Sequence, residues 1–178
     1  RKTLKQRNFL LKTKAKKNDL LPWDFKLSEF GVELWKEKNR LLQKFQKNLN
    51  TASNNYNKEG VLVGVSQKTQ EENPDHFLFQ LEKHKTKDLA LGYTTFGPHT
   101  DRIGVFFNNK NIKTFGSQGE HKIALVLIKI AEYELINEEK KLSPTILLDD
   151  LFATLDFERG DAVLKLLEKN TQTIITNT

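Results

Sequence analysis

Cysteine and methionine are absent from the 178 residues of this sequence, and proline occurs only four times. Without cysteine the chain forms no disulfide and no thiolate metal site, and we expect a protein of the reducing cytoplasm. No apolar run is long enough to cross a bilayer and no signal peptide is recognisable, so we expect no membrane partner. The four histidines stand at no metal-ligand spacing, which argues against zinc binding.

A phosphate-binding loop is also missing. The pattern Gly-x-x-x-x-Gly-Lys-Ser/Thr, whose backbone cradles nucleotide phosphates, occurs nowhere in the sequence. The chain begins with Arg1 instead of methionine, and without further N-terminal strands the apolar strand around Leu147 would lack neighbours in its sheet. Because such a strand would leave an open sheet edge, we expect the natural protein to extend beyond Arg1 toward the N-terminus.

The charge that is present is mainly basic. The hydrophobic content of 37% permits a modest core, and the net charge is +6. Basic residues crowd the first 17 positions, among them Lys12, Lys14, Lys16 and Lys17. Such a cluster can bind the phosphates of DNA. A solvated helix face carries the same residues, and both interpretations stay open.

A helical arm is predicted for the first part of the chain. Residues 1–17 carry a broken helical pattern, and apolar residues recur at spacings of three, four and seven over residues 23–49. Two such helices joined by a polar turn form an antiparallel arm. Residues 50–60 predict a loop, because they are polar and end in glycine. We assign residues 1–92 to the arm and its return.

Residues 93–178 predict an α/β lobe. A hairpin is expected for residues 103–107 and 111–115, because the asparagines between them tolerate left-handed backbone angles. A long helix is expected over residues 118–140. The all-apolar run 146–148, a helix over 157–169 and a second β run at 173–176 then form a parallel β-α-β unit.

Two carboxylates follow the apolar strand directly. Asp149 and Asp150 come after Ile146-Leu147-Leu148, at the strand end where parallel sheets bind ligands. One carboxylate there can hold Mg²⁺ and the next can orient a hydrolytic water. An acidic turn after a strand is the plainer alternative.

A capped helix start precedes them. Ser117 and Glu120 have the spacing of a capping box, and Gly119 lets the backbone approach a ligand closely. The unpaired N–H groups of such a helix end can bind phosphate, although a well-capped helix with no further role explains the same residues. Asp156, downstream, is suited to cap the following helix.

The ordered series resembles an ATPase head. Ser117-Gln118-Gly119-Glu120, then the Asp149-Asp150 pair, then Leu155-Asp156 are similar to the signature, Walker B and D-loop of ABC-type ATPases. Within that group the chain resembles the RecF family. The segments that carry this resemblance are Gly97-Pro98-His99-Thr100-Asp101, Phe115-Gly116-Ser117-Gln118-Gly119, the Arg7-Asn8 stretch and the strand ending at Thr176.

The resemblance implies a fold and residue roles. The fold class would be α/β, an incomplete ABC-type head lobe with an inserted helical arm. Asp149 would bind Mg²⁺ and Asp150 would polarise the attacking water. Thr176 would occupy the switch position. The signature residues 117–120 would contact ATP held by a partner protomer, and the D-loop residues 155 and 156 would organise the dimer.

The resemblance also implies a function. A RecF-like protein would be a weak DNA-dependent ATPase and an ATP-dependent homodimeric clamp, acting in DNA repair at duplex DNA with gaps, with RecO and RecR as partners in recombinase loading. The chain alone would be inactive, because it has no phosphate loop. Two departures leave the 97–101 segment without an assigned role: Thr100 stands where the family favours a basic residue, and Arg102 where it favours an acidic one.

Two other functions remain open. A head fragment of an SMC- or Rad50-like ATPase would share the motifs, but the arm lacks the sustained heptads of a long coiled coil. A binding module for DNA or protein, without enzymatic activity, would keep the acidic strand end for structural reasons only.

Overall fold

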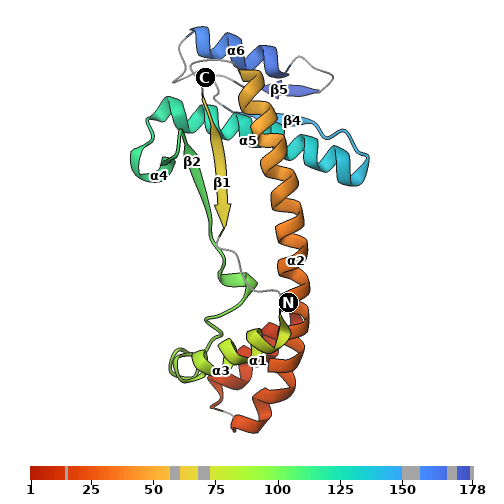
Figure 1. The fold of residues 1–178 in the computed structure, drawn as a ribbon, viewed down its shortest axis with the longest axis vertical. Helices are drawn as coiled ribbons and strands as arrows, with labels where there is room; N and C mark the ends of the chain where they lie inside the picture. The colour runs from red at the N-terminus through yellow and green to blue at the C-terminus, as the bar shows by residue number, and fades with distance from the viewer. Residues whose placement is uncertain (15, 57–60, 68–72, 150–156, 168–171, 177–178) are drawn as a thin grey trace. The chain divides into compact units, whose positions relative to one another are not determined.

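The computed structural model describes residues 1–14, 16–56, 61–67, 73–149, 157–167 and 172–176 (Figure 1). Contacts divide the chain into two compact units. Unit 1 comprises residues 1–40 and 67–102, and unit 2 comprises residues 41–66 and 103–178. The predicted boundary at residue 92 differs from this division, because residues 41–66 of the predicted arm pack with the last part of the chain.

Unit 1 is built from three helices. Helix α1 (Lys2–Lys12) is followed by the long helix α2 (Lys17–Tyr56), which contributes to both units, and by α3 (Pro74–Leu91). The ends of α3 follow local rules: the Asn73 side chain accepts a bond from the N–H of Asp75, and Gly92 ends the helix with a left-handed φ of 72°. Both ends of α3 are therefore set by residues adjacent to it in the sequence.

The apolar core of unit 1 is small and aromatic. Val32, Trp35, Phe77 and Leu81 are buried, and the Trp35 and Phe77 rings lie 4.9 Å apart. Gly31 is required here, because a Cβ at this position would stand 2.4 Å from the Phe77 ring. The predicted apolar stripe of the arm was partly wrong: Phe30 and Leu34 are more than half exposed, since Val32 and Trp35 are the residues that face Phe77.

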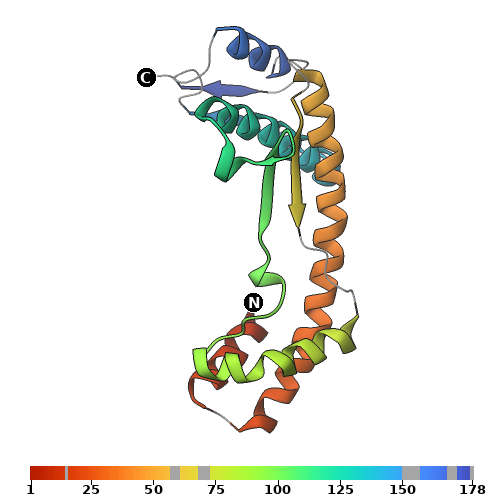
Figure 2. The ribbon, with the colours of Figure 1, turned by 60° about the vertical axis from the view of Figure 1, so that its left-hand side comes forward.

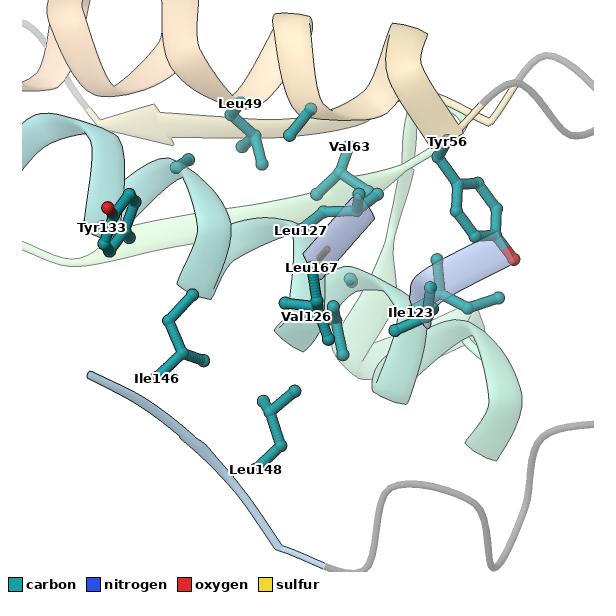
Figure 3. Packing of buried hydrophobic residues seen from close by; sticks show 14 of the residues in the cluster. Leu49, Tyr56, Val63, Ile123, Val126, Leu127, Tyr133, Ile146, Leu148 and Leu167 are labelled. Carbon is teal, nitrogen blue, oxygen red and sulfur yellow. The ribbon is translucent and has the colours of Figure 1, made fainter. Parts of the chain in front are cut away.

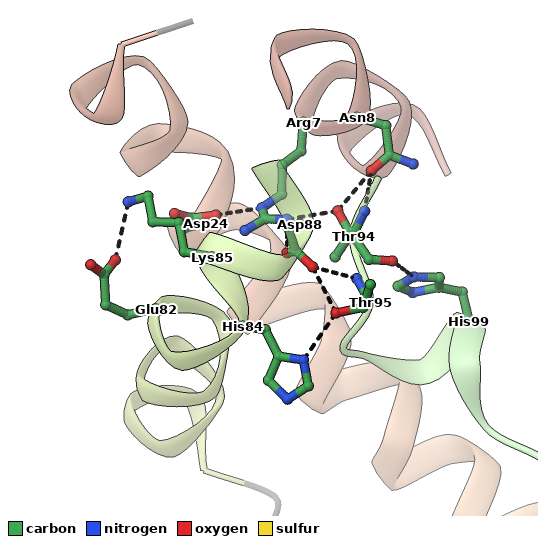
Figure 4. Close-up of polar contacts among 10 residues, drawn as sticks. All are labelled: Arg7, Asn8, Asp24, Glu82, His84, Lys85, Asp88, Thr94, Thr95 and His99. Atoms are coloured by element: carbon green, nitrogen blue, oxygen red, sulfur yellow. Dashed lines mark hydrogen bonds and ion pairs between the residues drawn. The ribbon is translucent and has the colours of Figure 1, made fainter. Parts of the chain in front are cut away.

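Buried polar groups join the three helices of unit 1 (Figure 4). Arg7 of α1 is fully buried and donates to Asp24 of α2 at 2.6 Å and to Asp88 of α3 at 2.7 Å. The same guanidinium donates to the Thr94 hydroxyl at 2.8 Å. Asn8 accepts from the backbone N–H and the hydroxyl of Thr94. Helix α1 is thereby tied to both α2 and α3 by charge-assisted hydrogen bonds.

Unit 2 contains a small mixed region of strands and helices. Strands β1 (Val63–Gln67), β2 (Ile103–Phe107) and β3 (Lys110–Asn111) form one sheet in that order. Asn108 and Asn109 have φ of 48° and 64°, so the predicted hairpin turn is confirmed. The second hairpin strand is shorter than predicted, because the Asn111 side chain caps a helical turn, α4 (Ile112–Phe115).

The β-α-β unit forms as predicted. Strand β4 (Ile146–Leu148) pairs in parallel with β5 (Thr173–Ile175), and α6 (Phe157–Leu167) lies between them in the sequence. Helix α5 (Gln118–Lys140) precedes them, and Figure 2 shows the blue strand β5 between α6 and α5. The all-apolar strand was expected to be covered on both faces, but Leu147 is 69% exposed. In the described part of the chain, helices cover one face of this strand pair only.

The larger core lies in unit 2 (Figure 3). Buried residues of α5, α6, β1 and β4 meet there, with Leu127, Val63 and Val163 fully enclosed. The end of α2 joins them through Leu49, Ala52 and Tyr56. This packing explains why residues 50–56 are helical although their polar sequence predicted a loop: tertiary burial outweighs local propensity. A search of the described helices finds none that could span a membrane.

Candidate functional site

The first element of the candidate site is the start of α5. Ser117 is the N-cap: its hydroxyl accepts from the N–H of Glu120 at 3.3 Å, and the Glu120 carboxylate accepts from the N–H of Ser117 at 2.7 Å. The predicted capping box is confirmed. Gly116, the residue before Ser117, lies close to the backbone of α4. A Cβ at this position would stand 2.6 Å from the carbonyl oxygen of Ile112.

Backbone donors remain at this helix end. In the first turn of an α-helix the N–H groups of residues such as Gln118 and Gly119 have no carbonyl four residues earlier within the helix. They point outward along the helix axis and carry the positive end of its dipole. Ser117 and Gln118 are exposed and Gly119 is half-buried, so an anion can reach them.

Glu120 is an ionised group at this helix end. The backbone N–H of Ser117 lowers the pKa of the Glu120 carboxyl below its ordinary value of 4.5, and the Ser117 hydroxyl, Arg159 and Lys110 act in the same direction. Burial opposes the shift. The carboxylate is therefore held in its charged form at neutral pH, where it satisfies one of the free donors of α5.

The second element is the carboxyl end of the β4–β5 pair. Leu148 is paired with Ile175, and the N–H of Thr176 donates to the carbonyl oxygen of Leu148 at 3.0 Å. Asp149 and Thr176 are the next residues along the two strands, and both are exposed. The Thr176 hydroxyl donates to the Asp149 carboxylate. Two side chains predicted from separate motifs are thus in direct contact.

The two elements remain separate within this chain. Among the described residues, no hydrogen bond or ion pair joins the start of α5 to Asp149 or Thr176. Asp150, Leu155 and Asp156 lie outside the described residues. Likewise, no group of three or more His, Cys, Asp or Glu side chains in the described ranges could hold a metal ion by itself. Any metal at Asp149 would need further ligands from a nucleotide or from residues beyond these ranges.

The predicted DNA-binding lysines lie around the end of α1. Lys12, Lys14 and Lys16 are exposed, and Lys14 has a left-handed φ of 51°. The Lys17 side chain lies outside the described part of the chain. Arg7, which belongs to the same basic cluster, is not available to DNA, because its guanidinium is buried against Asp24 and Asp88.

The 97–101 segment, to which sequence reasoning assigned no role, makes its contacts within unit 1. The Asp101 carboxylate accepts from the indole N–H of Trp35 at 3.0 Å and pairs with Lys38 at 2.5 Å. His99 bonds the carbonyl oxygen of Thr94 through Nε2. Gly97 adopts a φ of 128°, which side chains rarely allow. These contacts anchor the segment to α2.

Known proteins resemble this chain along its whole length. The DNA replication and repair protein RecF of Ruminiclostridium cellulolyticum is 32% identical over 196 aligned residues, which cover 99% of this chain and 51% of that protein. RecF of an Exiguobacterium species is 33% identical, again over 99% of this chain and 51% of the relative. The chain spans about half the length of these curated relatives. No protein-family model matches it.

Solved structures agree with these relatives. The structure of the recombination mediator RecF with ATP in the RecFOR pathway superposes with a TM-score of 0.81 at 29% identity, over 99% of this chain and 50% of that one. A second RecF structure, named as the ATPrS form, gives a TM-score of 0.80. The chain is homologous to the C-terminal part of RecF.

The match to RecF confirms the predicted resemblance and fold class. The chain has the architecture of an incomplete α/β lobe of an ABC-type ATPase head, with helices preceding it. The assignment of individual RecF-like site residues rests on their motifs and geometry. Sequence reasoning missed the direct bond between Thr176 and Asp149; the parallel register predicted for the two strands was the signal that could have found it.

Proposed function

We propose that this chain is the C-terminal half of a RecF-like ATPase that mediates recombinational DNA repair in the cytoplasm. The observation that carries the proposal is the Asp149–Thr176 contact at the carboxyl ends of two parallel strands. This contact lies in a chain that resembles RecF proteins along its full length, and one solved structure among them is of RecF with ATP. In parallel α/β sheets this edge is where ligands bind.

The donor set at Asp149 suits Mg²⁺. Its carboxylate is exposed and offers oxygen, the ligand atom that Mg²⁺ prefers, and Mg²⁺ commonly takes one or two carboxylates together with nucleotide phosphates. Bound there, Mg²⁺ would neutralise phosphate charge during hydrolysis. Asp149 would hold the ion, and Asp150, the next residue, would orient the attacking water.

The start of α5 would act on a second molecule. By the resemblance to ABC-type heads, in which ATP lies between two protomers, the signature residues 117–120 would reach the γ-phosphate of ATP bound by a partner protomer. The free N–H groups of Gln118 and Gly119 and the Ser117 hydroxyl supply the donors. Leu155 and Asp156 would organise the same dimer interface, and Thr176 would respond to nucleotide at the switch position.

DNA would bind to the ATP-bound dimer through its backbone. Lys12, Lys14, Lys16 and Lys17 would contact phosphates, which would give binding without sequence preference. The proposed substrate is duplex DNA at gaps, the proposed partners are RecO and RecR, and the outcome is recombinase loading. ATP turnover would be weak and would depend on DNA.

The proposal is tested by Mg-ATP binding, followed by fluorescence anisotropy of a labelled ATP analogue. Full-length protein here means a RecF-type N-terminal half joined to the start of this chain. We expect the full-length protein to bind and this chain alone not to bind. Asp149→Ala should remove the Mg²⁺-dependent part of the affinity. Asp161→Ala, at an exposed carboxylate of α6 paired with Lys165, is the matched control and should behave as wild type. Tight binding by this chain alone would contradict the assignment.

The main alternative is a binding module without enzymatic activity. It predicts that Asp150→Asn in the full-length protein leaves ATP turnover unchanged, whereas the RecF-like mechanism predicts loss of hydrolysis with nucleotide binding retained. An SMC- or Rad50-like head is less well supported, because the similarity to RecF covers 99% of the chain, arm included.

A further inference from the structure

The position of Thr176 is set by the backbone of two strands. Ile146, Leu147 and Leu148 pair with Thr173, Ile174 and Ile175, and the N–H of Thr176 continues this ladder to the carbonyl oxygen of Leu148 at 3.0 Å. At the other end of the pair, the N–H of Ile146 donates to the carbonyl oxygen of Gln172 at 2.9 Å. The register is therefore fixed at both ends, and Thr176 stands beside Asp149.

The hydroxyl of Thr176 uses its single proton on Asp149. An ionised carboxylate only accepts hydrogen bonds, so the hydroxyl must be the donor in this contact. The bond is made to Oδ1. In the described part of the chain Oδ2 has no protein donor, so it is the oxygen that can face a cation. The β-branched threonine side chain also has few χ1 rotamers, which keeps the hydroxyl aimed at Asp149.

We propose that Thr176 is a positioning residue that orients the Asp149 carboxylate for a divalent cation. The inference rests on the proposed function, because it assumes that Asp149 is the metal ligand. Thr176 itself touches neither metal nor nucleotide in this role. It fixes which carboxylate oxygen is presented to the ion, and it ties the carboxylate to β5, so that a displacement of β5 would change the affinity for the cation.

The expected effect follows from how metal ligands behave in general. A ligating carboxylate is usually held by a hydrogen bond from a residue behind it, and loss of that bond typically weakens metal binding by about 10- to 100-fold. Thr176→Val keeps the shape and removes the donor. Thr176→Ser keeps the donor, so it should bind metal to within a few-fold of wild type.

The experiment measures Mn²⁺ binding to the full-length protein by electron paramagnetic resonance, with a non-hydrolysable ATP analogue present. Thr145→Val is the matched control. It removes a hydroxyl at the far end of the same strand pair, where Thr145 donates to the Gln172 side chain at 2.9 Å. We expect Thr176→Val to weaken Mn²⁺ binding about 10- to 100-fold and Thr145→Val to leave it unchanged. Analogue affinity without metal should be the same in all variants.

Repeating the measurement in an Asp149→Asn protein distinguishes positioning through Asp149 from a general loss of structure. If Thr176 acts through Asp149, Thr176→Val should add no further loss in an Asp149→Asn protein. Equal losses in both backgrounds, or wild-type Mn²⁺ affinity in Thr176→Val, would overturn the inference. The proposed function would still stand in that case if Asp149→Asn itself weakens Mn²⁺ binding. A wild-type protein that binds neither analogue nor Mn²⁺ would overturn both.

Discussion

At the residue scale, Arg7 differs most from what its sequence context indicates. It stands among exposed cations, yet its side chain is enclosed and paired with Asp24 and Asp88. These partners lie 17 and 81 residues away in the sequence. Local pattern carries no information on contacts of that separation, so only the three-dimensional structure reveals that the Arg7-Asn8 stretch is a packing element.

Arg7→Ala should destabilise the folded protein by about 3–5 kcal/mol, because it leaves two buried carboxylates without their cation. Lys5→Ala on the exposed face of α1 is the control and should change the free energy of unfolding by less than about 0.5 kcal/mol. Urea denaturation followed by circular dichroism gives both values. Similar values for the two variants would mean that the buried network contributes little.

The Asp149–Thr176 contact is the residue-scale feature closest to function. The sequence predicted both residues, since an acidic strand exit and a polar residue after the next strand are visible in it. Their bond could be anticipated only from the parallel register. By contrast, the roles of Trp35 and Lys38 as partners of Asp101 could not, because α2 presents different residues from those of the predicted stripe.

At the scale of elements, the strongest local signals were confirmed. The capping box fixes the start of α5, and the asparagine pair fixes the hairpin turn, because each acts within a few residues. The prediction failed at residues 50–56 because distant packing decides there: these residues continue α2, since Ala52 and Tyr56 reach the core of unit 2. It failed at residues 112–115 for a local reason, because the Asn111 side chain caps a helical turn where a strand was predicted.

The capping box gives α5 a defined dependence on pH. A carboxyl whose pKa falls on folding contributes its full stabilisation above its unfolded value of 4.5 and loses it as the pH falls through the lower folded value. Glu120→Gln keeps a side chain that can cap but cannot titrate. We expect wild type to be the more stable protein at neutral pH, and the difference to shrink once the pH falls below 4.5.

Urea denaturation of both proteins at a series of pH values measures that difference. A gap that stays constant through 4.5, or widens in acid, would show that the Glu120 charge does not support the helix start. Ser117→Ala removes the other half of the capping box and should cost about 1 kcal/mol at neutral pH. The cost should be smaller in acid, because the Ser117 hydroxyl also helps to lower the pKa of the Glu120 carboxyl.

At the scale of the whole molecule, the exposed lysines around the end of α1 are the residues that we expect to bind DNA. Replacing Lys12, Lys14 and Lys16 together by alanine should weaken binding to gapped duplex DNA. The slope of log binding constant against log salt concentration should become shallower by about 1 for each lysine that contacts a phosphate. The control replaces Lys36, Lys83 and Lys87, three exposed lysines elsewhere in unit 1. Filter binding at several salt concentrations compares them, and equal losses would indicate net charge instead of a local site.

The chain spans about half the length of its RecF relatives, and its own features are consistent with one half of a composite site. It has a signature-like helix start and a strand end with Asp149, but no phosphate loop. In the proposed dimer each ATP needs Asp149 from one protomer and Ser117 from the other. That arrangement is the central claim of the proposed mechanism.

The direct test mixes two inactive full-length variants, Ser117→Arg and Asp149→Ala, and measures DNA-dependent ATP hydrolysis. A mixed dimer would contain one site with an intact Asp149 and an intact partner Ser117. An equal mixture should therefore recover about a quarter of the wild-type rate, because about half of the dimers are mixed and each has one working site of two. No recovery in a mixture that is shown to form mixed dimers would contradict action of the signature in trans.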